Sequence, residues 1–127
     1  MPSGDERTRQ MEKVATKMRT LGYAASPLLS ELSSSDSPGK RLAAITILQV
    51  QPNPQMFEWL ADRLGIEKPF LGYHAAVALL TAARVHDEDQ TDQLRNAIEK
   101  AKNRLGDRRR GTDRDRVLND ALRELDE

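Results

Sequence analysis

The chain has 127 residues, in which 20 lysine and arginine residues balance 20 aspartate and glutamate residues, and it contains no cysteine. This length suits one domain with a buried core, and the balanced charge argues against a global field that attracts nucleic acid or an anionic membrane. The absence of cysteine excludes disulfides and thiol chemistry. Residues 1–7 are polar without a following apolar stretch, and no apolar run approaches the roughly 20 residues that span a bilayer. We therefore expect a cytoplasmic protein without a membrane segment.

The first predicted helix covers residues 5–21, where apolar side chains recur on one face at helical spacing. Gly22 follows as a stop signal. With a second helix over residues 27–34, it forms a predicted N-terminal capping region at residues 5–34. The serine-rich residues 33–37 are expected to act as a hinge between this region and the rest of the chain.

Four helices are predicted to begin with a proline, and in three of them a serine or asparagine precedes it. Proline suits the first helical position because its φ is fixed and it has no N–H to leave unpaired, and serine or asparagine can cap the first turn. We expect Gly65 to end the helix that begins at residue 54. The close spacing of the predicted helices at residues 38–51 and 54–64 indicates a tight helix–turn–helix. The four predicted helices cover residues 27–34, 38–51, 54–64 and 69–85.

The predicted helix over residues 69–85 carries apolar or small side chains around nearly its whole circumference. Only His74, Thr81 and Arg84 interrupt this ring, and their spacing places them on one narrow strip. Such a helix needs other helices on most sides, which leaves the strip for solvent or a partner. Together with Lys40 and Arg41, these three residues form the candidate partner surface.

Two amphipathic helices complete the chain, over residues 91–105 and 113–125. Gly106 is a suitable residue to follow the first, and Thr112 with Asp115 indicates a cap for the second. No segment combines strand alternation with β-branched residues. The predicted fold class is therefore all-α, with six or seven helices.

Residues 39–48 align with residues 71–80 at an offset of 32, and small and aliphatic residues coincide at five positions. Each copy begins near a proline and precedes a second amphipathic helix, as in α-solenoids. The pattern predicts two HEAT-like helix pairs over residues 37–105, in an α-α superhelix. Residues 5–34 and 112–126 would cap it within one domain, 1–127. Alternatively, alanines and aliphatic residues simply recur in packed helices.

Four segments of the chain resemble a small HEAT-like helical module of bacteria. They are GKRLAAI (39–45), LQV (48–50), EWLADRL (58–64) and EKPFLGYHAA (67–76). That module is similar to one found beside TIR, caspase-like and trypsin-like effector domains in signalling or conflict proteins. The resemblance implies an accessory interaction module whose partner domain supplies the chemistry. No effector domain accompanies it in these 127 residues.

Candidate catalytic residues are few, because His74 and His86 are the only histidines. The acidic residues 87–89 after His86 are expected to form a solvated helix start. The chain has no HExxH, no Gly-x-Ser-x-Gly, no Gly-rich phosphate loop and no Cys/His metal spacing. We expect no enzyme activity, no metal, no cofactor and no small-molecule substrate.

The arginine run Arg108, Arg109 and Arg110 is the alternative functional feature, since clustered guanidinium groups suit phosphate binding. Aspartates interleave with these arginines, and no aromatic residues accompany them for base stacking. A nucleic-acid-binding adaptor is therefore the second interpretation, after a solvated loop.

Trp59 is expected in the core; if it is exposed, Met56, Trp59 and Arg63 could form an interaction hot spot. Residues 67–70 are expected to act as a staple between two helices. The leading hypothesis is a non-catalytic protein–protein interaction or scaffolding module in bacterial signalling or defence. Its partner would be an effector-domain protein or a second copy of the chain.

Overall fold

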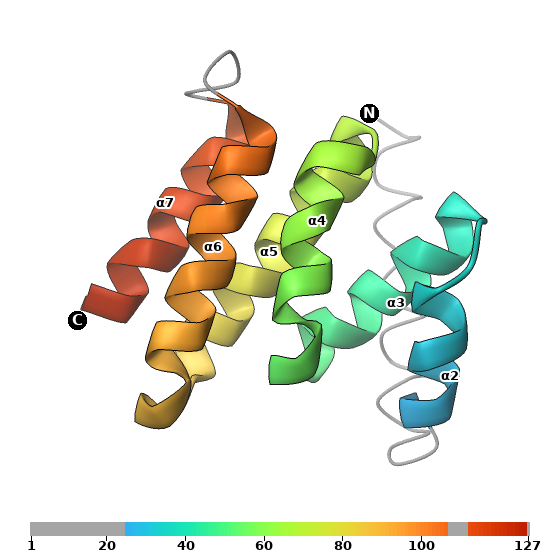
Figure 1. The fold of residues 1–127 in the computed structure, drawn as a ribbon, viewed down its shortest axis with the longest axis horizontal. Helices are drawn as coiled ribbons and strands as arrows, with labels where there is room; N and C mark the ends of the chain where they lie inside the picture. Colours follow the sequence, from blue (N-terminus) through green and yellow to red (C-terminus); the bar gives the residue numbers. More distant parts are fainter. Residues whose placement is uncertain (1–24, 107–111, 127) are drawn as a thin grey trace, which may run out of the picture. The chain divides into compact units, whose positions relative to one another are not determined.

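The computed structural model describes residues 25–106 and 112–126 (Figure 1). This part of the chain contains α-helices and two short 3-10 turns and no strand, which confirms the all-α prediction. The predicted helix over residues 5–21 lies outside the described residues. The helices are α2 (Ala25–Ser33), α3 (Pro38–Val50), α4 (Phe57–Ile66), α5 (Pro69–Val85), α6 (Thr91–Leu105) and α7 (Asp113–Asp126), with the turns η2 (Pro54–Met56) and η3 (Glu88–Gln90).

Most predicted helix starts are confirmed. At α3, Pro38 occupies the first turn and the Lys40 N–H donates to Ser37 Oγ at 3.4 Å. At residue 53 the same pattern opens the 3-10 turn η2 and not an α-helix, with the Gln55 N–H donating to Asn53 Oδ1 at 3.0 Å. α5 begins at Pro69 as predicted, although Lys68 supplies no side-chain cap.

The prediction that Gly65 ends a helix is wrong. α4 continues through Gly65 to Ile66, and the Glu67 N–H closes its last turn by donating to Arg63 O at 3.1 Å. A Cβ atom on Gly65 would lie 3.2 Å from Arg104 Cβ, so the absence of a side chain at this position allows the close approach of Arg104. Gly106, in contrast, follows α6 with a φ of +83°, a region that favours glycine. The helix-ending role predicted for Gly106 is confirmed.

The chain divides into two compact units, residues 1–51 and 52–127. In the first, α2 packs against α3, and α3 is buried around a whole turn at five consecutive residues: Ala44, Ile45, Thr46, Ile47 and Leu48. The Thr46 hydroxyl donates to Leu42 O at 2.9 Å, so this buried polar group is paired. The serine segment lies inside this unit, where Ser34 Oγ donates to Ser30 O at 2.9 Å. The division between the units falls at residues 51–52 and not at the serine segment.

In the second unit, α4 packs against α5 and α6, and α5 packs against α7 (Figure 1). Asp62 Oδ1 lies 3.3 Å from Lys100 Nζ, and Arg84 Nε lies 3.6 Å from Glu124 Oε1. The Asp62–Lys100 contact and the approach of Gly65 to Arg104 follow the same order along both helices, so α4 runs parallel to α6. α5 runs parallel to α7, because Gly72 at its start lies beside Arg114 at the start of α7. Contacting residues in each parallel pair lie about 40 positions apart in the chain.

The core of the second unit lies between these helices. α5 contributes mainly small buried residues, which allow its neighbours to approach closely. Their larger partners are fully buried side chains on the surrounding helices: Phe57, Leu60, Leu64, Leu94, Ile98 and Leu118. No helix in the described part of the chain is long and apolar enough to span a membrane.

Candidate interaction surface around the central helix

Two residues of the predicted polar strip are engaged within the second unit. The Thr81 hydroxyl donates to Val77 O at 3.0 Å, one turn earlier on α5. Arg84 is exposed and forms an ion pair with Glu124 of α7. Both side chains therefore already have partners, Thr81 within α5 and Arg84 on α7, and a molecule that binds here meets them paired.

His74 lies half-buried in an aromatic cluster on the first turns of α5. Its ring meets the Phe70 ring at a centroid distance of 4.7 Å and the Tyr73 ring at 5.4 Å, both edge to face. Burial disfavours the charged imidazolium and lowers the pKa of His74 below its ordinary value of 6.5. His74 therefore behaves at neutral pH as an uncharged member of an aromatic surface.

An exposed apolar surface surrounds this histidine. Ile66 is 69% exposed, Phe70 40% and Tyr73 37%. We call Ile66, Lys68, Phe70, Tyr73 and His74 the α4–α5 corner. Sequence reasoning missed this surface because it assigned residues 67–70 to a staple. Sequence periodicity could not have found it across the junction, because Glu67 and Lys68 are extended and interrupt the helix between Ile66 and Phe70.

Positive charges border the corner. Lys68 is exposed and forms no ion pair with another described residue. Arg104 approaches Gly65, and Arg114 approaches Gly72, where a Cβ atom would lie 3.4 Å from Arg114 Cδ. The Glu67 carboxylate of the same junction is only 5% exposed, and its Oε2 atom accepts from Arg63 Nη1 at 3.2 Å. Because Arg104 Nε pairs with Asp62 Oδ1 at 3.5 Å, Lys68 is the exposed cation of the corner that has no ion pair with another described residue.

The other end of α5 carries the opposite charge. Val85 is 64% exposed and is followed by the exposed carboxylates of Asp87, Glu88 and Asp89. We call these four residues the α5 tail. His86 Nδ1 lies 2.6 Å from Ala83 O, which directs this ring toward the helix end. Within the described residues, no cluster of three or more His, Asp or Glu side chains is arranged to hold a metal ion.

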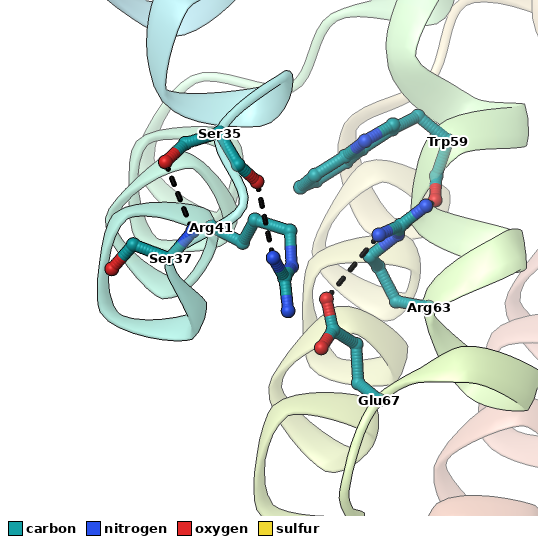
Figure 2. Close-up of polar contacts among 6 residues, drawn as sticks. All are labelled: Ser35, Ser37, Arg41, Trp59, Arg63 and Glu67. Atoms are coloured by element: carbon teal, nitrogen blue, oxygen red, sulfur yellow. Dashed lines mark hydrogen bonds and ion pairs between the residues drawn. The ribbon is translucent and has the colours of Figure 1, made fainter.

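Lys40 and Arg41 of the predicted partner surface belong to the first unit. Lys40 is exposed in the first turn of α3. Arg41 reaches back to the turn before the helix, where its Nη1 donates to Ser35 O at 3.0 Å (Figure 2). The Ser37 N–H also donates to Ser35 Oγ, at 3.1 Å. Arg41 therefore stabilises the serine turn.

Trp59 is half-buried and lies off the buried face of α4. The Arg63 guanidinium lies 4.6 Å from the centre of its ring, and Arg63 Nε donates to Trp59 O at 3.1 Å. Figure 2 shows Arg63 between Trp59 and Glu67. Trp59 is therefore not one of the buried core residues that the sequence predicted it to join, and its ring contacts the Arg63 guanidinium.

Arg108, Arg109 and Arg110 of the alternative nucleic-acid surface lie outside the described residues. Of the arginines that follow, Arg116 forms an ion pair with Asp113, with Nη1 3.7 Å from Oδ1. Comparisons with known proteins give no match, whether to a family model, to a curated protein or to a solved structure.

Proposed function

We propose that this protein is a non-catalytic protein–protein interaction module of the cytoplasm, with the α4–α5 corner as its binding surface. The exposure of Ile66, Phe70 and Tyr73 on adjoining helical turns carries this proposal. Exposed apolar side chains that gather in one place mark interaction sites, and aromatic residues dominate the energetics of such sites. Half-buried His74 braces the two aromatic rings, so the surface is partly preorganised.

The arrangement of the second unit supports the HEAT-like part of the proposal. Parallel packing of α4 on α6 and of α5 on α7 relates segments about 40 residues apart, the usual length of a HEAT repeat. Stacked helix pairs of this kind present extended binding surfaces. We propose that the chain serves a separate effector-domain protein in bacterial signalling or defence, in line with the family that its sequence resembles.

Site-directed photocrosslinking tests the proposal. A photoreactive phenylalanine analogue is introduced at Tyr73 in cells that make the protein, and adducts are identified by mass spectrometry. The matched control carries the same residue at Asn96, an exposed position on α6. A protein adduct at position 73 and none at position 96 supports the proposal. Equal labelling at both positions, or no protein adduct at either, overturns it.

Nucleic-acid binding is the second candidate, and one observation favours it. Phe70 and Tyr73 supply exposed aromatic rings on the first turns of α5, and Arg114 approaches the same helix at Gly72; aromatic rings and an arginine at one helix suit base stacking beside phosphate contacts. Retention on single-stranded DNA or RNA at low salt, lost in Tyr73→Ala but kept in Asn96→Ala, would support this alternative. Absence of retention at low salt would exclude it.

A further inference from the structure

We draw no further inference here: the strongest candidate, the exposed apolar surface patch of Ile66, Phe70 and Tyr73 at the α4–α5 corner, carries nothing beyond the proposed function because nothing in the structure shows what covers it.

Discussion

The Arg63 guanidinium lies over the Trp59 ring at 4.6 Å while its Nη1 donates to Glu67 Oε2 at 3.2 Å. Trp59 and Arg63 lie four residues apart on α4, and Glu67, four residues further on, follows the last residue of the helix. The Arg63 and Glu67 side chains are only 12% and 5% exposed. Cation–π contacts gain strength when the groups are shielded from water, and removing one partner of a shielded ion pair leaves the other charge uncompensated.

Arg63→Ala is expected to lower the free energy of unfolding by roughly 2 kcal/mol, because it removes a shielded partner of Glu67 and uncovers the Trp59 ring. Arg63→Lys should recover only part of this loss, since an ammonium group cannot stack as a plane or donate from two directions. Urea unfolding measures both values. If Arg63→Ala stays within about 0.5 kcal/mol of the wild type, these contacts of Arg63 have no structural role.

Gly72→Ala and Gly65→Ala should differ in their effect. Alanine favours a helix over glycine by about 1 kcal/mol. At Gly72 the new Cβ would meet Arg114 Cδ at 3.4 Å and Leu64 Cδ1 at 3.7 Å, which are ordinary contacts, so we expect a gain of about 0.5–1 kcal/mol. At Gly65 it would lie 3.2 Å from Arg104 Cβ, close to the backbone, so we expect little gain or a loss.

Thermal unfolding of the two variants under identical conditions checks this difference, and Gly39→Ala serves as a control. A Cβ at residue 39 would meet only Ser37 Oγ, at 3.8 Å. Equal stabilisation by all three substitutions would contradict this expectation. It would show that the Arg104 side chain moves aside without cost and that α4 and α6 are not tightly packed at Gly65.

His74 should make the stability depend on pH. Burial lowers its pKa in the folded protein, whereas the unfolded chain takes up a proton as the pH falls through about 6.5. The unfolded state then binds more protons than the folded state, so the free energy of unfolding decreases as the pH drops below this value. At higher pH both states are neutral and the contribution of His74 is constant.

His74→Gln should remove this part of the pH dependence, while His86 and all carboxylates remain as an internal control. The comparison requires urea unfolding of both proteins at about pH 8 and about pH 5.5, on either side of the ordinary histidine pKa. The same decrease in both proteins would show that other groups cause it.

Arg84→Ala is expected to change the free energy of unfolding by no more than about 0.5 kcal/mol, because the Arg84–Glu124 pair is exposed and its atoms lie 3.6 Å apart. A double-mutant cycle with Glu124→Ala isolates the interaction. A coupling above about 1 kcal/mol would mean that this pair is an important clamp between α5 and α7.

The helices were predictable because local signals and burial agree. Pro69 and the ring of small side chains up to Val85 define α5 without knowledge of its neighbours. Likewise, the period of the buried residues from Leu94 to Leu105 defines α6. The end predicted at Gly65 is wrong because a glycine in a helical segment indicates either a helix end or a close contact. The close contact here is with Arg104, which lies 39 residues away in the sequence.

The candidate surface was only partly predictable. The polar strip drew attention to His74, but its importance lies in the rings on either side, and their exposure depends on how α4 meets α5. Trp59 is half-buried, between the core position that the sequence predicts and the exposed alternative. The guanidinium four residues later, which the sequence also contains, gives that ring another partner.

The packing of the helices in the second unit also determines the order in which they unfold locally. α7 rests mainly on α5, and α4 rests on both α5 and α6, so α4 and α5 make substantial contacts on more sides than α7 does. Local opening should therefore begin at the C-terminal helix and spread inward, with each helix protected by those it still touches. Amide hydrogen exchange should accordingly be graded along the chain, slowest at Ala76 and Leu79 in the centre of α5 and fastest in α7.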